Sequence, residues 1–303
     1  MLNIQKNLEI KTKKGIIDLN KPCIMGILNV TPDSFYDGNK YYSNGKSIQT
    51  STEKSTEKAV AQAKKMILEG AKIIDVGGES SRPGSEPVSF EEELRRVIPV
   101  ITKISRQHPK IVISVDTCKP KVAEGAIRAG ADIINDITGL KDPQMCEVGA
   151  KHNVPVIIMH MKGNPKTMQE NPKYNDVVDD IKFFFKSQIQ KAKLYGIKQI
   201  ILDPGIGFGK TLDHNLEIIR RLNEFNEFKE LGYPVLIGVS RKSFISMLNI
   251  RNHNKSLSAE DRLPGTVAAN VMSIINGANI IRVHDVKEHN QMIDLIMELQ
   301  HGI

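Results

Sequence analysis

Residues 111–136 read IVISVDTCKPKVAEGAIRAGADIIND and contain a strand, a helix and the next strand. The run Ile111–Val115 is β-branched and apolar, as expected of a strand that is buried on both faces of a parallel sheet. The amphipathic stretch Pro120–Ala129 separates it from a second such run, Ile133–Asn135. This order indicates an α/β protein in which helices cross over between parallel strands.

The same alternation continues in both directions along the chain. Six more apolar runs predict strands: Ile24–Val30, Ile73–Val76, Val156–Met159, Ile200–Leu202, Val235–Val239 and Ile280–Val283. Six more amphipathic stretches predict helices: Lys54–Glu69, Phe90–Gln107, Asp176–Tyr195, Leu212–Phe225, Asp261–Asn276 and Lys287–Leu299. Eight strand–helix units in about 280 residues predict a single (β/α)8 TIM barrel. A doubly wound sheet is the alternative, but its G-x-G-x-x-G turn is missing after the first strand.

Two segments do not follow the repeat. Leu8–Asn20 alternates on both sides of Lys14-Gly15 and predicts a β-hairpin that closes the bottom of the barrel. The stretch 41–57 is rich in Ser, Thr, Lys and Gly with little apolar periodicity, which predicts a loop before the first helix. We therefore expect one domain over residues 1–303, with residues 1–22 as an N-terminal hairpin extension.

The composition is that of a globular protein: 40% of the residues are hydrophobic and 25% are charged, which argues against whole-chain disorder. Apolar runs stay shorter than the roughly 18–20 residues of a bilayer span, and the N-terminal residues lack a signal-peptide core. The three cysteines cannot all pair and show no C-x-x-C spacing. These features predict a cytoplasmic protein that is not inserted in a membrane.

The formal net charge of +7 is compatible with anionic substrates or with nucleic acid. The lysines are scattered, the chain has no Trp, and aromatic residues make up only 5% of it. A base-stacking surface is therefore disfavoured, and we expect a small anionic substrate instead of nucleic acid.

In a barrel of this kind the chemistry sits at the carboxyl ends of the strands. Asp116, Asn135 and Asp203 follow apolar runs directly and are expected to point into the mouth of the barrel, where an unpaired carboxylate is costly. Positive charge would come from the last two strands, through Lys242, Arg282 and His284. An anionic half beside a cationic half indicates a polar heterocycle that carries a phosphate.

Other polar residues near strand ends have a simpler interpretation. We expect four of them to cap the following helix: Asp75, Thr117, Asp136 and Asp285. His160 has no second histidine at metal-binding spacing, so we expect it to be packed or to line a substrate site.

Seven motifs then occur in order along the chain: GILNVTPDSFYDG, GGESSRPGSEPVS, SVDT, INDI, DPGIGFGK, GVSRKSF and RVHDV. In this order and spacing they resemble the dihydropteroate synthase family over about Cys23 to Leu299. The resemblance implies a transferase of folate biosynthesis. It would join 6-hydroxymethyl-7,8-dihydropterin diphosphate to p-aminobenzoate, with Mg²⁺ on the diphosphate, and give 7,8-dihydropteroate and pyrophosphate. It also implies a homodimer and inhibition by sulfonamides.

The resemblance assigns roles by motif position. The implied catalytic residues are Asp116, Lys242 and Asp37. The implied pterin site comprises Asp116, Asn135, Met159, Asp203, Gly238 and Lys242. The implied p-aminobenzoate site comprises Ser81, Arg82, Pro83, Phe208, Lys242 and Ser243. The implied diphosphate site comprises Asn29, Arg282 and His284, with Asn29 near the Mg²⁺.

Elementary chemistry agrees with two of these roles. An ionised Asp203 can accept two adjacent N–H groups of an aminopyrimidinone ring. In the dissociative mechanism that the resemblance implies, Asp116 beneath the ring would stabilise a methylene cation. The chain departs from the family pattern at Ser81, where the family usually has threonine.

Two alternatives remain at this point. A pterin-binding barrel that transfers a methyl group from methyltetrahydrofolate would share Asp116 and Asn135, but it would not need SSRPG or the pair Arg282 and His284. A catalytically inactive pterin-binding protein would be supported by loss of a cation-site residue, and those residues are all present.

Overall fold

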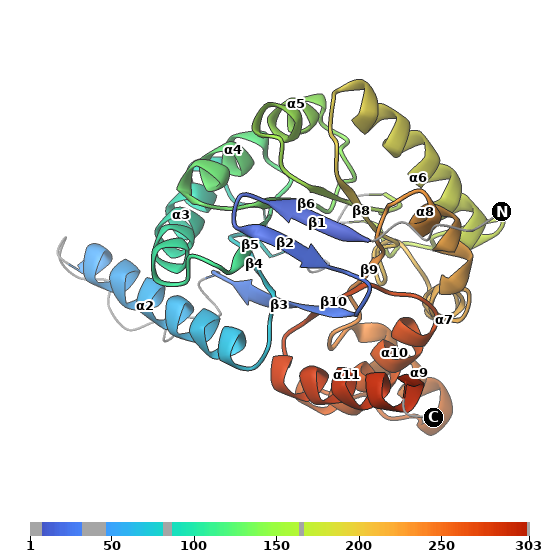
Figure 1. Cartoon of the computed structure of the whole chain (residues 1–303). Helices are drawn as coiled ribbons and strands as arrows, with labels where there is room; N and C mark the ends of the chain where they lie inside the picture. The colour runs from blue at the N-terminus through green and yellow to red at the C-terminus, as the bar shows by residue number, and fades with distance from the viewer. Residues whose placement is uncertain (1–7, 32–46, 81–86, 164–166, 302–303) are drawn as a thin grey trace.

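The computed structural model describes residues 8–31, 47–80, 87–163 and 167–301, and within them eight parallel strands form a barrel surrounded by helices (Figure 1). The strands are β3 (Cys23–Asn29), β4 (Ile73–Gly77), β5 (Val112–Asp116), β6 (Ile133–Asp136), β7 (Val156–Met159), β8 (Ile200–Asp203), β9 (Leu236–Ile237) and β10 (Ile280–Val283). Their order in the sheet is β8-β7-β6-β5-β4-β3-β10-β9. A parallel bridge between Leu202 and Val235 joins the two ends of the sheet, which confirms the predicted barrel.

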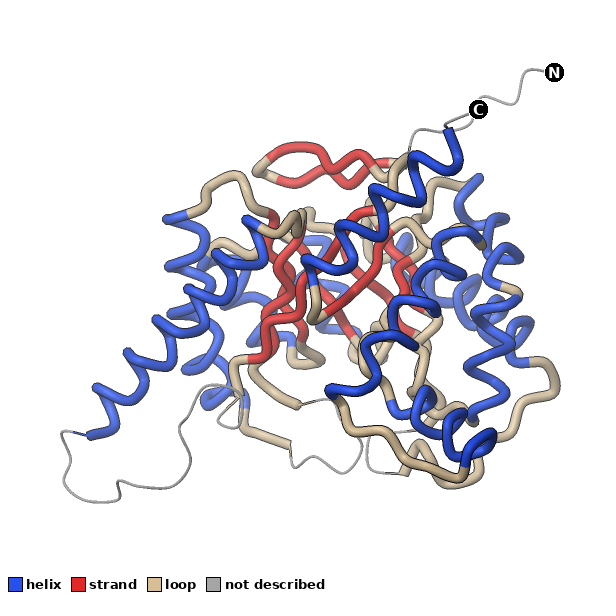
Figure 2. Tube along the Cα trace, turned by 90° about the horizontal axis from the view of Figure 1, so that it is seen from below, coloured by secondary structure: helices blue, strands red, loops and turns tan. Residues whose placement is uncertain are grey.

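Helices lie outside the strands on all sides (Figure 2). The longer ones are α2 (Ser47–Leu68), α3 (Phe90–Gln107), α4 (Pro120–Ala129), α5 (Pro143–His152), α6 (Val177–Leu194), α7 (Leu212–Arg220), α9 (Ser243–His253), α10 (Leu263–Ile275) and α11 (Val286–His301). Three shorter ones also occur among the described residues: η1 (Leu222–Phe225), α8 (Asn226–Glu230) and η2 (Glu260–Arg262). No helix in the described part of the chain is both long and apolar enough to cross a bilayer.

The N-terminal hairpin closes one end of the barrel, as predicted. Strands β1 (Glu9–Thr12) and β2 (Gly15–Asp18) pair antiparallel across a turn at Lys13-Lys14, one residue earlier than predicted. Leu8, Ile10 and Leu19 are buried against the first inward-facing residues of the barrel strands. The chemistry must therefore lie at the opposite end.

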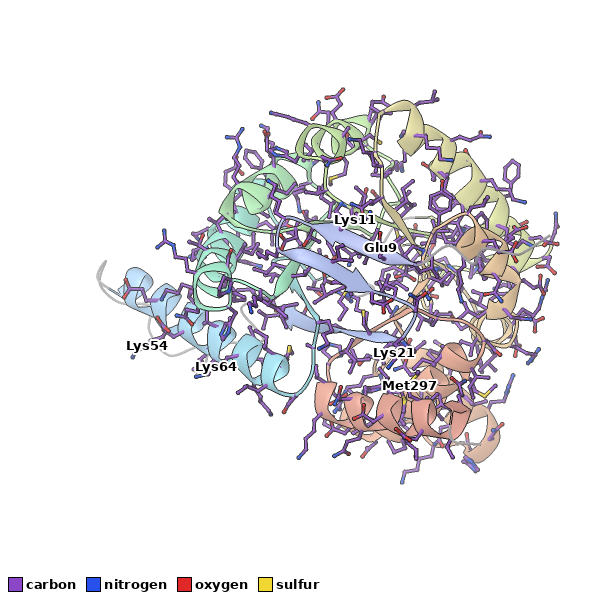
Figure 3. The ribbon with its side chains drawn as sticks, in the orientation of Figure 1. Glu9, Lys11, Lys21, Lys54, Lys64 and Met297 are labelled. Atoms are coloured by element: carbon purple, nitrogen blue, oxygen red, sulfur yellow. The ribbon has the colours of Figure 1, made fainter. Side chains whose placement is uncertain are left out.

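Charged side chains lie on separate elements of the outer surface. Figure 3 shows Glu9 and Lys11 on the hairpin, where they form a 2.9 Å ion pair, and Lys54 and Lys64 on α2. This distribution agrees with the scattered lysines of the sequence.

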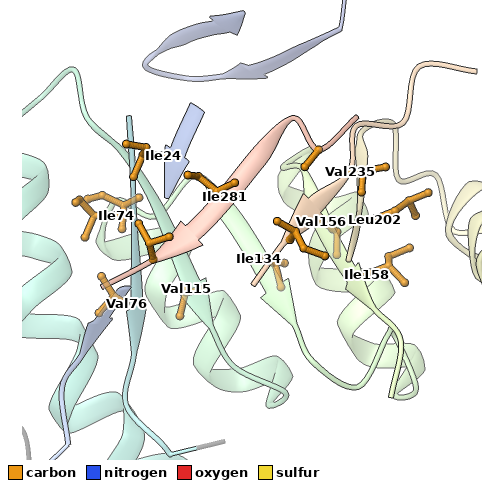
Figure 4. Packing of buried hydrophobic residues seen from close by; sticks show 14 of the residues in the cluster. Ile24, Ile74, Val76, Val115, Ile134, Val156, Ile158, Leu202, Val235 and Ile281 are labelled. Carbon is orange, nitrogen blue, oxygen red and sulfur yellow. The ribbon is translucent and has the colours of Figure 1, made fainter. Parts of the chain in front are cut away.

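Alternation along the strands separates two sets of side chains. Outward-facing residues such as Ile74, Val115 and Ile134 pack with the helices in the main core (Figure 4). Inward-facing residues begin with an apolar set next to the hairpin: Met25, Ile73, Val112, Ile133, Ile157, Ile201, Leu236 and Ile280. Because successive side chains of a strand point to opposite faces, the residue two positions further on also faces inward.

That second inward position holds mostly polar side chains. Two residues beyond the apolar set come Ile27, Asp75, Ser114, Asn135, Met159, Asp203, Gly238 and Arg282. The parallel register places Asp116 beside both Gly77 and Asn135. Period-two alternation thus builds an apolar floor and, above it, a polar chamber.

Several predicted boundaries were wrong. Helix α2 begins at Ser47, so the predicted loop 41–57 is helical from there on, while 41–46 lie outside the described residues. Helices α5 and α9 were not predicted. The predicted helix Leu212–Phe225 is divided, because α7 ends at Arg220 and η1 follows.

Candidate active site

Arg282 joins the two sides of the chamber. Its Nε donates to Asp75 Oδ2 at 2.6 Å and its Nη2 donates to Asp116 Oδ2 at 2.6 Å. The same Asp75 oxygen accepts Asn135 Nδ2 at 3.1 Å. Four strands, β4, β5, β6 and β10, are therefore connected through one guanidinium and two carboxylates.

Burial changes the acidity of Asp116. Its pKa is raised from 3.8 to about 7, mainly because burial disfavours the carboxylate, while the charge of Arg282 acts in the opposite direction. The neighbouring carboxylate of Asp75 raises this pKa further. Asp116 is thus a carboxyl group whose charge changes near neutral pH.

A second pair of opposite charges lies at the ends of β8 and β9. Asp203 is buried, and its Oδ1 accepts the backbone N–H of Gly205 at 2.7 Å. Burial raises the pKa of Asp203, and the charge of Lys242 counteracts that rise. Burial also lowers the pKa of Lys242 to about 8, against the effect of Asp203. The predicted anionic and cationic residues therefore meet at this end of the barrel.

Gly238 leaves room for the cations. A Cβ at this position would lie 3.9 Å from both Lys242 Nζ and Arg282 Cβ. Lys242 Nζ also contacts the carbonyl oxygen of Ile206 and lies 4.7 Å from the centre of the Phe208 ring. A side chain at 238 would therefore meet the Lys242 ammonium group and the base of the Arg282 side chain.

The loop after β8 packs tightly against the loop after β7. A Cβ on Gly205, whose φ is +69°, would lie 2.0 Å from the carbonyl oxygen of His160. Lys210 Nζ donates to the Phe208 carbonyl at 3.0 Å and lies 2.9 Å from His160 Nδ1. Burial lowers the pKa of His160 to about 2, so His160 is a packed, neutral residue, as expected. This packing fixes the backbone that carries Asp203 and Phe208.

The end of β3 offers oxygen ligands. Gly77 stands between Asn29 and Asp116: a Cβ on Gly77 would lie 3.8 Å from Asn29 Oδ1 and 3.7 Å from Asp116 Oδ2. Mg²⁺ in enzymes is commonly held by one or two protein oxygens together with substrate phosphates and water. The described residues contain no group of three or more His, Cys, Asp or Glu side chains that could hold an ion alone. Asn29 and Asp116 thus offer oxygen atoms of the kind that Mg²⁺ prefers, close to each other at the mouth.

Comparison with known proteins is consistent with this chamber. The model of the pterin-binding enzyme family matches residues 25–284. Dihydropteroate synthase of Escherichia coli K12 is 48% identical over 274 residues, which cover 90% of this chain and 89% of the relative. The chain belongs to the dihydropteroate synthase family.

Solved structures of this family superpose over nearly the whole chain. The Yersinia pestis dihydropteroate synthase with a sulfonamide drug complex has a TM-score of 0.84 and 40% identity, and the match covers 96% of this chain and 99% of that one. The Xanthomonas albilineans dihydropteroate synthase with 4-aminobenzoic acid has a TM-score of 0.85 and 38% identity, with coverage of 98% and 99%. The barrel and the N-terminal hairpin are thus those of dihydropteroate synthases.

The structure brings together most of the residues that the family resemblance singled out. Nine lie at the carboxyl-terminal end of the barrel: Asn29, Asp116, Asn135, Met159, Asp203, Phe208, Gly238, Lys242 and Arg282. His284 follows β10, where its Nδ1 lies 2.9 Å from Ser240 Oγ, and Ser243 is the first residue of α9. The remaining four, Asp37, Ser81, Arg82 and Pro83, lie outside the described residues.

The helix-cap predictions need correction. Asp75 is fully buried in the chamber, where it accepts hydrogen bonds from Arg282 and Asn135 instead of capping a helix. Asp136 accepts the N–H groups of Thr138 and Leu140 and so stabilises a turn. Asp285 does stand directly before α11, as predicted, and its side chain forms a forked pair with Arg241, with distances of 2.6 and 2.8 Å.

Sequence reasoning also missed an ionic cluster next to the SSRPG motif. Lys119 Nζ contacts Glu79 and lies 2.6 Å from Glu93 Oε2, and Glu93 is completely buried. Glu79 Oε1 also accepts the N–H of Val88 at 3.3 Å. The cluster ties the residues on either side of the motif to α3 and α4. The one hint of this cluster in the sequence is Lys119, a lysine at the position directly before Pro120, where α4 begins.

Proposed function

We propose that the mouth of the barrel condenses 6-hydroxymethyl-7,8-dihydropterin diphosphate with p-aminobenzoate, giving 7,8-dihydropteroate and pyrophosphate. The observation that carries the proposal is the pairing of Asp116 with Arg282 beside Asp203 and Lys242, in a chain of this family. The Xanthomonas albilineans relative has been solved in complex with 7,8-dihydropteroate, the product named here.

The pterin would lie in the chamber beside Asp203, Lys242 and Asn135, above the carboxylate of Asp116. Asp203 would accept two adjacent N–H groups of the aminopyrimidinone, since an ionised carboxylate offers two acceptor oxygens. Lys242 would donate to the ring carbonyl and N5. Asn135 would donate and accept at the ring edge, while Met159 and Gly238 would contact its faces.

The diphosphate would lie towards Arg282 and His284. A leaving diphosphate gains negative charge as its bond to carbon breaks, so cationic and donor side chains stabilise the transition state. Mg²⁺ bound to the diphosphate, near Asn29, would supply further neutralising charge.

The p-aminobenzoate would be held above the pterin by Phe208, Lys242 and Ser243, together with Ser81, Arg82 and Pro83. The benzoate carboxylate would accept hydrogen bonds from Ser243 at the N-terminus of α9, where unpaired backbone N–H groups favour an anion. A sulfonamide would compete for the same place.

The chemical step would begin with departure of pyrophosphate, which takes the electron pair of the C–O bond. A pterin-stabilised methylene cation remains, and Asp116 beneath the ring would stabilise it. The aniline nitrogen of p-aminobenzoate then forms the new C–N bond and loses a proton. Asp37 and Lys242 complete the proposed catalytic set.

The test is pyrophosphate release from the pterin diphosphate with and without p-aminobenzoate. The proposal predicts stoichiometric formation of 7,8-dihydropteroate when both substrates are present, and its inhibition by a sulfonamide. Binding of the pterin without turnover would indicate a catalytically inactive pterin-binding protein. Methyl transfer from methyltetrahydrofolate to a corrinoid partner would instead support the methyltransferase alternative.

We further propose that the chain acts as one pterin-binding domain over residues 1–303 and forms a homodimer in the cytoplasm. Free thiols at Cys23, Cys118 and Cys146 fit a reducing compartment. Four apolar side chains on α9 and α10 are 45–55% exposed, and they would be covered in a dimer: Met247, Ile250, Met272 and Ile275. Sedimentation of the chain and of an Ile275→Glu variant tests this, since the variant should be monomeric.

A further inference from the structure

Asp75 lies fully buried in the chamber, although neither the motifs nor the implied substrate contacts include it. It lies on β4, and its two hydrogen-bond partners come from strands that are not its neighbours in the sheet. Arg282 reaches it from β10 across β3, and Asn135 reaches it from β6 across β5. We propose that Asp75 is a positioning residue, which fixes Arg282 and Asn135 for the condensation proposed above, on which this inference rests.

The depth of the three side chains supports this role. The side chain of Asp75 is fully buried, whereas those of Asp116 and Arg282 are 12% and 18% exposed. The Nε of Arg282 therefore binds the deeper carboxylate, Asp75, while its Nη2 binds Asp116 nearer the mouth. An incoming diphosphate can replace Asp116 at Nη2 and leave the bond to Asp75 intact.

Stability does not explain a carboxylate at this place. Asp75 Oδ1 has no hydrogen-bond partner among the described residues, and neither has Ser114 Oγ on the register-paired neighbour. Asp75 also places a like charge next to Asp116, since its carboxylate raises the pKa of the Asp116 carboxyl group. An unsatisfied buried oxygen and excess like charge both destabilise a fold. Asp75 thus costs stability and contributes orientation.

The orientation matters because an arginine side chain has several rotatable bonds, and ordering it at the moment of binding costs free energy. Without Asp75, the carboxylate left to pair with Arg282 at hydrogen-bond distance is that of Asp116. Arg282 would then pair with Asp116 alone, the carboxylate that is needed beneath the pterin. Asn135 would at the same time lose the acceptor that sets its amide plane.

The first test is Asp75→Asn, which keeps the size of the side chain and removes its charge. We expect kcat/KM for the pterin diphosphate to fall by about ten- to a hundredfold, as for loss of a charged hydrogen bond. Affinity should fall more for the pterin diphosphate than for hydroxymethyl-dihydropterin. The melting temperature should be unchanged or higher. A lower melting temperature with unchanged kinetics of the folded fraction would overturn the proposal.

The matched control is Asp132→Asn. Asp132 is also a buried carboxylate of the barrel, but it lies at the hairpin end, where it contacts Lys14 at 2.8 Å and the N–H of Ile113 at 3.0 Å. Its variant should lose stability and keep its kcat/KM within about twofold, because its partners are structural.

A double-mutant cycle shows whether Asp75 acts through Arg282. If it does, Asp75→Asn should have little further effect in an Arg282→Ala background. If the two substitutions lower kcat/KM by independent factors that multiply in the double variant, the proposal is refuted. If Asp75→Asn does not fold, the smaller Asp75→Ser replaces it, and failure of both variants would assign Asp75 a structural role instead.

The inference and the proposed function can fail separately. Absence of pyrophosphate release from the wild-type protein would refute the function. The NMR signal of the Arg282 Nε–H reports the orientation directly: slow exchange with solvent in the wild type, fast exchange in Asp75→Asn. Equal exchange in both proteins would refute the positioning role whatever the activity.

Discussion

Arg282 Nη2 lies 2.6 Å from Asp116 Oδ2, so the proposed leaving-group residue neutralises the proposed cation-stabilising residue. The two roles are incompatible with a permanent bond, because the carboxylate is needed under the pterin and the guanidinium is needed at the diphosphate. We therefore expect the diphosphate both to bind Arg282 and to free the charge of Asp116.

The acidity of Asp116 predicts a pH dependence of the reaction. Because its pKa is about 7, the carboxylate is lost as the pH falls through neutrality. We expect kcat/KM for the pterin diphosphate to decrease below about pH 7, since this parameter reports groups of the free enzyme. Asp116→Asn should have low activity, and its kcat/KM should not decrease as the pH falls below 7. A flat profile of the wild type between pH 6 and 8 would contradict the assignment.

The same shift predicts a pH dependence of stability. The folded-state pKa of Asp116 is higher than the unfolded value, so the folded protein binds the proton more tightly. The free energy of unfolding should therefore decrease from about pH 4 to about pH 7 through this group. Urea unfolding at several pH values measures it, and Asp116→Asn should lack this component.

Asp203→Asn should weaken pterin binding strongly. The amide replaces one acceptor oxygen with a donor that faces N–H groups of the ring, and a charged hydrogen bond is lost. The cost should be about 2–4 kcal/mol in binding free energy. Calorimetry with hydroxymethyl-dihydropterin measures it, with thermal unfolding as a check that the variant is folded. An unchanged affinity would show that Asp203 does not bind the ring.

Arg282→Ala and His284→Ala should differ in severity. Arg282 carries a permanent charge, whereas His284 can be neutral and its Nδ1 lies 2.9 Å from Ser240 Oγ. We expect the arginine variant to lose more kcat, because the charge of the diphosphate grows in the transition state. Both variants should bind the bare hydroxymethyl-dihydropterin nearly normally. The reverse ranking at one pH near neutrality would place His284 at the leaving group.

Gly205→Ala should destabilise the protein more than Gly196→Ala. Both glycines have a positive φ, +69° and +89° respectively, so each alanine is strained. A Cβ at Gly205 would also meet the His160 carbonyl at 2.0 Å, whereas at Gly196 the nearest atom is 3.9 Å away. This collision should lower the free energy of unfolding of Gly205→Ala by about 1–3 kcal/mol more than that of Gly196→Ala. Urea unfolding of the two variants compares them, and equal losses would mean that strain alone acts.

Much of the fold could be predicted because the barrel strands are short apolar runs with polar ends. The hairpin was found from its alternation around Lys14-Gly15. Helix α9, SFISMLNIRNH, was missed because its apolar residues lie on every side and give no periodic signal. Helix α5 was missed because it is short. Asp142 at its N-cap and Pro143 at its first position are nevertheless signals of a helix start.

The beginning of α2 shows a different limit. Its first residues, SIQTSTEKSTE, lack an apolar stripe and include Thr, a weak helix former. Further along, Ala59, Val60 and Ala63 are buried in the main core, and the helix extends backwards from that anchored part.

The site was predicted mainly from residues that stand at or just beyond the end of an apolar run. Asp116 and Asp203 were found in this way. Asp75 precedes the end of its strand, and its role depends on Arg282, which is more than two hundred residues away in the chain. Contacts of this kind depend on strand order around the barrel, which local sequence does not specify.

The alternation of the barrel strands limits how such an enzyme can change during evolution. Each chamber residue has an immediate neighbour that belongs to the helix-packed core: Val115 before Asp116, Ile134 before Asn135, Leu202 before Asp203. Inserting or deleting one residue in a strand would send a carboxylate into the core and an isoleucine or valine to the substrate. The strands can therefore diverge by substitution but not by changes in length, and altered selectivity must arise from single side chains or from the loops.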